Sequence, residues 1–150
     1  MQNNLDHLFI AAAGNDAIEI DDHYRPLPCG FVEPNLMCVA SSLYYGTMSY
    51  DSNYGEKYVH VTAPGHDVYS TVPGGSYAYM SGTSMSAPMV SGLAALVKTM
   101  REDLTGTEVK EVILANVETN INYNGLVSSK GSIDVEATIL ALKNDETKGM

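Results

Sequence analysis

Three short, mostly apolar runs constrain the fold of this chain more than any other feature of its sequence. They lie at residues 8–13, 36–40 and 58–62, and turn or loop residues bound each of them. Such a run is typical of a strand that is buried on both faces, as in a parallel sheet. The sequence therefore predicts part of a parallel sheet in the first half of the chain.

The segments between these runs have the composition of loops. Residues 16–35 contain three prolines, and residues 43–57 are rich in Tyr, Ser, Gly and Asp, so we expect both to be surface loops. A fourth strand is expected at 67–72, ahead of a turn at 73–75. The prolines and glycines thus mark the ends of the expected strands.

The second half of the chain is helical in pattern. Apolar residues recur every three or four positions over residues 84–100, which indicates an amphipathic helix. Thr105 and Glu108 form a capping-box pattern that opens a second helix, and a third is expected at 134–143. Strands followed by amphipathic helices predict an α/β fold in which helices flank the partial parallel sheet. A length of 150 residues suits one domain.

The charge of the chain limits the classes of partner that it is expected to bind. Eight Lys and Arg against eighteen Asp and Glu give a net charge of −10, which argues against nucleic acid and anionic membranes as partners. No apolar run approaches the roughly 18 residues of a membrane-spanning helix. The two cysteines, Cys29 and Cys38, are too few for a zinc site. They are either buried thiols or a local disulfide, and the sequence is compatible with both interpretations.

Ser84 is the first candidate for chemistry, because a Gly-Thr lead-in places it at the first turn of the long helix. Free backbone N–H groups and the positive end of the helix dipole lie there, and both favour an oxyanion. Serine is also a common N-cap residue, so its position alone favours a capping role over a nucleophilic one.

The surrounding heptapeptide, Gly82–Pro88, resembles the active-site serine signature of the subtilisin-like serine proteases, the subtilases. Four further segments resemble subtilase sequences in the same order along the chain, at 11–15, 36–40, 63–65 and 131–137. The resemblance covers about residues 7–142. It implies that residues 1–150 are the C-terminal portion of a catalytic domain with an incomplete three-layer α/β fold.

The resemblance implies specific roles for individual residues. Ser84 is the expected nucleophile of a serine endopeptidase that cuts a peptide or protein substrate through an acyl-enzyme. Asn15 is expected to donate its side-chain amide to the oxyanion, beside the backbone N–H of Ser84. The expected substrate-binding residues are Ala12, Ala13, Gly14, Gly82 and Thr83.

The aspartate and histidine of the catalytic triad precede the serine in subtilases, and neither of their motifs occurs in this chain. The four histidines lack the neighbours that the family requires, so none is assigned as a base: His7, His23, His60 and His66. We expect an N-terminal half to carry both missing residues, and the isolated chain to be inactive and to fold poorly. The alternatives are a catalytically dead relative that acts in binding, half of a two-chain enzyme, or an unrelated α/β binding domain.

The resemblance also bears on specificity, metals and compartment. Four carboxylates follow Asn15, and they form either a solvated acidic loop, which is favoured, or a subsite for Lys or Arg: Asp16, Glu19, Asp21 and Asp22. Leu27-Pro28 is a candidate for the cis peptide bond of the family. Calcium is a candidate cofactor by resemblance, although the sequence contains no recognisable calcium loop. The resemblance also favours a protein that is secreted or resides in the secretory pathway.

Overall fold

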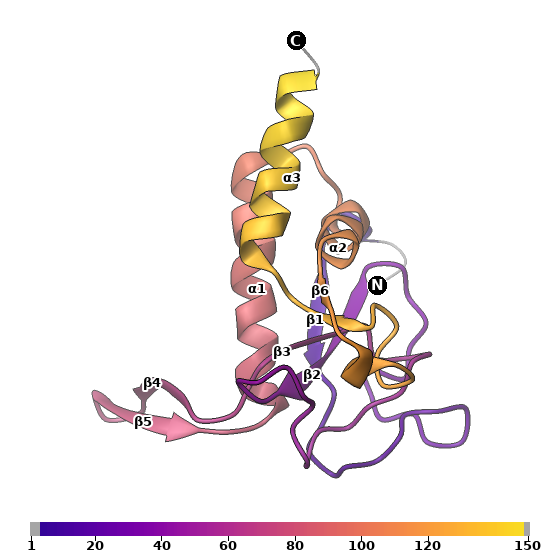
Figure 1. Ribbon diagram of the computed structural model, residues 1–150, viewed down its shortest axis with the longest axis vertical. Helices are drawn as coiled ribbons and strands as arrows, with labels where there is room; N and C mark the ends of the chain where they lie inside the picture. The colour runs from indigo at the N-terminus through magenta and orange to yellow at the C-terminus, as the bar shows by residue number, and fades with distance from the viewer. Residues whose placement is uncertain (1–3, 149–150) are drawn as a thin grey trace.

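The second apolar run forms the central strand of the sheet. In the computed structural model, which describes residues 4–148, β2 (Leu36–Ser42) is buried at every position. It pairs in parallel with β1 (Phe9–Ala12) on one side and with β3 (Val61–Pro64) on the other. Burial on both faces explains why this strand has a continuous apolar sequence without polar alternation. The predicted α/β fold with a parallel sheet is confirmed (Figure 1).

Two very short strands complete the sheet in the order β1-β2-β3-β7-β6. β7 (Gly131–Ser132) pairs in parallel with β3, and β6 (Glu118–Thr119) pairs antiparallel with β7. Two residues are too few to produce a periodic signal, so the sequence did not predict either strand. A single-turn 3-10 helix, η1 (Ile121–Tyr123), follows β6.

The third predicted strand, at 58–62, was misplaced by about three residues. The backbone N–H groups of Tyr58 and Val59 both donate to the Gly55 carbonyl, so the chain is still turning there. The strand begins only at Val61 and continues through Pro64, two residues beyond the predicted end. Tyr58 and Val59 are buried against the sheet, which accounts for their apolar character.

One face of the sheet is covered by helices. α1 (Thr83–Met100) packs across β1, β2 and β3, with α3 (Val135–Lys148) beside it, and α2 (Gly106–Ala115) contacts α1 and β2 (Figure 1). The core between helices and sheet contains residues of both, among them Met37, Val39, Val61, Val90, Leu93 and Val97. All three predicted helices are therefore present, and the capping box of Thr105 and Glu108 is formed.

The other face of the sheet is covered by loops. Cys38 and Ala40 alternate with the helix-facing residues of β2, so they point to this second face. They pack there against Ile20 and Tyr58 of the loops and Tyr123 of η1. Cys29 and Cys38 form a disulfide with an S–S distance of 2.01 Å, which ties the first loop to β2.

The two segments predicted to be surface loops are therefore partly buried. Ser49, Ser52 and Asn53 lie in the second segment and are all but inaccessible to solvent. They were misjudged because small polar residues are ordinary in exposed loops, and only the fold shows that these ones meet buried backbone groups.

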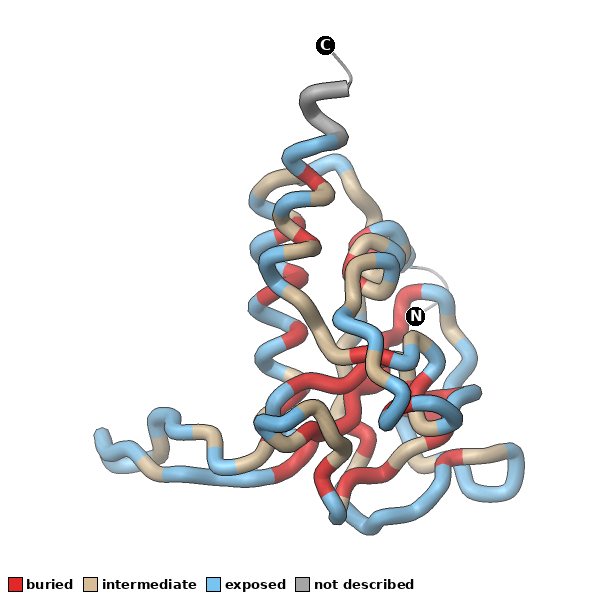
Figure 2. The backbone as a smooth tube through the Cα atoms, in the orientation of Figure 1, coloured by how far each residue is buried: buried red, intermediate tan, exposed pale blue. Residues whose placement is uncertain are grey.

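A hairpin projects away from the body of the molecule (Figure 1). It consists of the predicted strand β4 (Val68–Val72) and a strand that was not predicted, β5 (Ser76–Met80), paired antiparallel. Most of its residues are exposed (Figure 2). None of the helices described is both long and apolar enough to cross a membrane.

Candidate active site

Ser84 is the second residue of α1, and its side chain is exposed. The N-cap of the helix is Gly82, so no side chain of the cap residue can bond to the first turn. The interpretation of Ser84 as an N-cap is therefore wrong, because α1 begins one residue before it. Within the described part of the chain, the Ser84 hydroxyl has no hydrogen bond, so it is available for another partner.

The side chain of Asn15 is fixed by the residue that precedes Ser84. Its Oδ1 accepts hydrogen bonds from the backbone N of Thr83 at 2.9 Å and from Thr83 Oγ1 at 3.1 Å. A backbone N–H can only donate, so the amide branch that faces it must be the oxygen. The Nδ2 group of Asn15 is consequently the branch directed away from Thr83.

Gly82 permits this close approach of Asn15 to the start of α1. Its φ of 140° lies in a region that side chains rarely adopt, and a Cβ there would be 3.2 Å from Asn15 Nδ2. Gly14 is also bound, because its N–H donates to Thr83 Oγ1 at 3.1 Å. The Thr83 hydroxyl thus accepts from Gly14 and donates to Asn15, which connects the end of β1 to the start of α1.

These contacts bring together four of the seven residues that the sequence singled out, namely Gly14, Asn15, Gly82 and Thr83, and Ser84 directly follows Thr83 in α1. The other two lie just before them in the chain. Ala12 ends β1, and Ala13 is buried with its N–H bonded to the Val39 carbonyl. Their predicted contact with a substrate stays a prediction.

The segment Ala63–Gly65 is hydrogen-bonded to the start of α1. Ser86 Oγ donates to the Ala63 carbonyl at 2.9 Å, and the Gly82 N–H donates to the Gly65 carbonyl at 2.7 Å. A Cβ on Gly65 would collide with the hydroxyls of Ser86 and Ser41. Sequence reasoning noticed the Ala-Pro-Gly segment only by resemblance, and its physical role is to let β3 pass closely under the helix.

Sequence reasoning missed Asn53, a buried side chain that bonds to the loop carrying Asn15. Asparagine in a Tyr- and Ser-rich segment gives no local signal of burial. Its partners lie 35 to 40 residues away, so only the folded chain reveals the connection.

None of the four histidines, all within the described residues, is hydrogen-bonded to Ser84. His60 is largely buried, and its Nδ1 accepts from the Cys38 N–H at 2.9 Å. Burial, with a smaller contribution from the charge of Lys110, lowers the pKa of His60 to about 3. His66 lies 3.7 Å from the carboxylate of Asp67. Both make contacts within the fold, and none of the four histidines is assigned as a base.

Two of the carboxylates after Asn15, Asp21 and Asp22, bind partners within the fold. Asp22 binds Lys57 Nζ and the Tyr58 hydroxyl, each at 2.6 Å, and the hydrogen bond from Lys57 is the main reason that its pKa is lowered. Asp21 accepts from the backbone N–H groups of Tyr24 and His23, which lower its pKa. These contacts favour the interpretation of a solvated acidic loop. The Leu27–Pro28 bond of the same loop is cis, as the resemblance implied.

Calcium was a candidate cofactor by resemblance alone. Among the residues that the structure describes, no three Asp, Glu, His or Cys side chains gather where they could hold a metal ion. No set of side chains can therefore be assigned to calcium, and we derive no chemistry through it.

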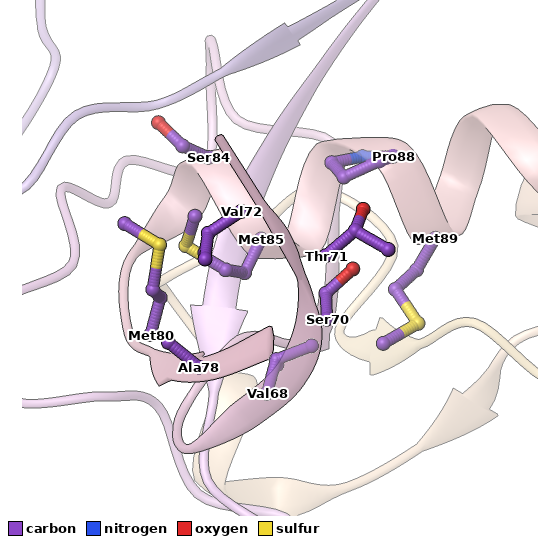
Figure 3. Close-up of a pocket in the computed structure, with 10 residues that line it drawn as sticks. All are labelled: Val68, Ser70, Thr71, Val72, Ala78, Met80, Ser84, Met85, Pro88 and Met89. Carbon is purple, nitrogen blue, oxygen red and sulfur yellow. The ribbon is translucent and has the colours of Figure 1, made fainter. Parts of the chain in front are cut away.

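A cavity of about 290 Å³ lies beside Ser84, between α1 and one face of the hairpin. Figure 3 shows Ser84 at its edge, with the hydroxyl directed away from the methionine side chains. The lining is mainly apolar and includes Val68, Val72, Ala78, Met80, Met85 and Met89. The exposed hydroxyl is therefore flanked by apolar side chains on the hairpin side.

Known proteins resemble this chain in sequence and in fold. The model of the subtilase family matches residues 1–132. Subtilisin-like protease 2 of Plasmodium falciparum is 37% identical over 145 residues, which cover 87% of this chain and 10% of that protein. The extracellular basic protease of Dichelobacter nodosus is 32% identical over 159 residues, covering 97% of this chain and 25% of that protein.

Several solved structures have a fold similar to that of this chain. A protease of Pseudoalteromonas arctica is similar with a TM-score of 0.77 at 29% identity, over 91% of this chain and 43% of its own. The A-subunit of the AB5 toxin from E. coli is similar with a TM-score of 0.82 at 24% identity, over 94% of this chain and 52% of its own. The chain thus spans about half the length of these structures and a quarter or less of the two relatives above.

Proposed function

Because this chain belongs to the subtilase family, we propose that it carries the nucleophile and the oxyanion-binding residues of a serine endopeptidase. Ser84 Oγ attacks the carbonyl carbon of the scissile peptide bond, and its proton passes to a general base. The amine product leaves with a proton from that base, and water then hydrolyses the ester formed on Ser84. Residues 1–150 are, in this proposal, the C-terminal portion of the catalytic domain.

The observation that carries this proposal is the orientation of the Asn15 amide. Thr83 holds Oδ1 from two atoms, so the Nδ2 group is fixed without having to reorganise during the reaction. A preorganised donor of this kind stabilises the charge that develops on the substrate oxygen. The backbone N–H of Ser84, in the first turn of α1, is the second donor.

The general base and its orienting acid come, in this proposal, from a histidine and an aspartate outside residues 1–150. Among the described residues no histidine bonds to Ser84, and β1 stands at the end of the sheet with β2 as its paired neighbour. That edge can accept another strand. We infer that the segment carrying the two residues extends the sheet there, and that the isolated chain is inactive.

In this proposal, Ala12, Ala13 and Gly14 flank the residue before the scissile bond, and Gly82 and Thr83 bound the same site from the start of α1.

The remaining features fit a protease that acts outside the cytosol. One similar protein is an extracellular protease, and the Cys29–Cys38 disulfide is typical of an oxidising compartment. We therefore propose a secreted protein with a peptide or protein substrate.

Fluorophosphonate labelling of the native protein tests the proposal, because this reagent modifies activated serines. We expect one labelled serine, Ser84, in a band larger than 16.1 kDa, and no labelling of the isolated chain. Ser84→Ala should abolish labelling. Ser91→Ala, which removes another exposed serine of α1, should leave it unchanged. A native protein that does not react would instead support a catalytically dead relative that binds peptides.

A further inference from the structure

We propose that Asn53 is a positioning residue, which holds the loop of Asn15 in the conformation that presents its amide to the oxyanion. This inference rests on the proposed function, since it requires Asn15 to bind the oxyanion. Asn53 itself does not touch the reacting atoms in this account. It acts through its contacts with the loop of residues 13–18, most of them to the backbone.

The side chain of Asn53 bonds to this loop on both sides of Asn15. Before Asn15, its Nδ2 donates to the Ala13 carbonyl at 3.0 Å. After Asn15, its Oδ1 accepts from the N–H groups of Asp16 at 3.0 Å and of Ile18 at 3.1 Å. One amide group therefore fixes the backbone where the loop enters and leaves Asn15.

Two further contacts bring Asn53 against the loop. Its backbone N–H donates to the Gly14 carbonyl at 2.9 Å, and its Nδ2 lies 3.4 Å from the Asp16 carboxylate. Gly14 packs so closely that a Cβ there would collide with Nδ2 of Asn53. Both positions are therefore matched in size, because a larger residue at either would push the loop away.

The burial of Asn53 differs sharply from the exposure of the loop that it holds. Asn53 is 1% exposed, whereas residues 15–19 are all exposed. A buried amide that satisfies its own hydrogen-bonding groups on the loop backbone is costly to displace. Thr83 orients the Asn15 side chain, and Asn53 orients the backbone from which that side chain projects.

A double-mutant cycle in the active native protein tests this role. Asn53→Ala should lower kcat by about tenfold to a hundredfold, because small displacements of catalytic donors are expensive. Asn15→Ala should lower kcat by about 10²–10³. In the Asn15→Ala protein, adding Asn53→Ala should lower kcat by less than about twofold, because the donor that Asn53 positions has already been removed.

Asn35 provides a matched control at the other end of β1. It is also fully buried, and its Nδ2 donates to the carbonyls of Asn4 and His7, before the strand. Asn35→Ala should destabilise the protein, and its effect on kcat should be the same with and without Asn15. If Asn53→Ala does not fold, Asn53→Asp takes its place in the same cycle: it keeps the acceptor for Asp16 and Ile18, loses the donor to Ala13 and places a carboxylate beside that of Asp16.

The outcomes separate this inference from the proposed function. If Asn15→Ala leaves kcat unchanged, the oxyanion role itself is wrong, and the positioning role is wrong with it. If Asn15→Ala lowers kcat but the two substitutions are additive, only the positioning role is overturned. Additivity would mean that Asn53 acts on general stability, as Asn35 does.

Discussion

The two sides of the candidate active site are held in different ways. On the Asn15 side, contacts come from residues far away in the sequence, with separations of 69 residues for Gly14–Thr83 and 37 for Asp16–Asn53. On the hairpin side, β4 and β5 pair mainly with each other, and three exposed tyrosines stack on one face: Tyr69, Tyr77 and Tyr79.

This difference separates order imposed by the whole fold from order imposed by a local turn. The Asn15 loop has little local order, so its geometry depends on the sheet and on α1 being in place. The hairpin has its own register and its own side-chain stack, and needs less from the rest of the chain. Substitutions on the two sides should therefore differ in size and in kind, in the native protein that contains this chain.

The largest expected effect is on the core beneath the Asn15 side. Leu93 of α1 is 2% exposed and packs between helix and sheet. Leu93→Ala should lower the free energy of unfolding by about 3 kcal/mol, because it removes buried surface and leaves a cavity. Urea denaturation measures this loss. A loss below about 1 kcal/mol would mean that α1 is anchored elsewhere.

The next effect concerns the bond between the two elements of the site. Thr83→Val keeps the shape of the side chain but removes the hydroxyl that accepts from Gly14 and donates to Asn15. We expect kcat to fall about tenfold, or about 1.4 kcal/mol in activation free energy. Steady-state kinetics on a peptide substrate checks this. An unchanged kcat would show that the backbone N–H of Thr83 alone orients Asn15.

A smaller effect is expected from pH. His60 is held neutral in the folded protein with a pKa of about 3, while in the unfolded chain its pKa is about 6.5. Its contribution to stability is complete above pH 6.5 and is lost as the pH falls towards 3, because only the unfolded state gains the proton. Between pH 7 and 6 this loss should be about 0.7 kcal/mol.

Comparing variants by urea denaturation at the two pH values isolates this contribution. His60→Gln cannot take up the proton, so it should lose less stability on acidification than the natural protein. His23→Gln, at an exposed position of the acidic loop, serves as the control and should behave like the natural protein. Equal pH dependence in all three would exclude His60 as the source.

The smallest effect is expected on the hairpin. Tyr77 is 59% exposed and contacts the ring of Tyr69 with centroids 5.6 Å apart. Tyr77→Ala should lower the free energy of unfolding by only about 0.5 kcal/mol, since an exposed cross-strand pair contributes little. A loss as large as that of Leu93→Ala in the same assay would erase the distinction between the two sides.

The sequence by itself determined the α/β class, the central strand and the three helices. Residues 36–40 are apolar without interruption, because the strand is buried on both faces. Residues 84–100 have apolar positions at helical spacing, because the helix is buried on one face. The resemblance at Gly82–Pro88 singled out Ser84, and the resemblance at residues 11–15 singled out Asn15. The structure places Asn15 against Thr83, the residue before that serine.

The tertiary structure alone decided how these residues are held. That Asn15 is clamped by Thr83, that Asn53 lies buried behind its loop, and that β3 starts at Val61 all depend on contacts between distant segments. The physical reason is that a buried hydrogen bond depends on which backbone groups the fold brings alongside a side chain. Local sequence records the type of a polar residue and carries no record of its distant partners.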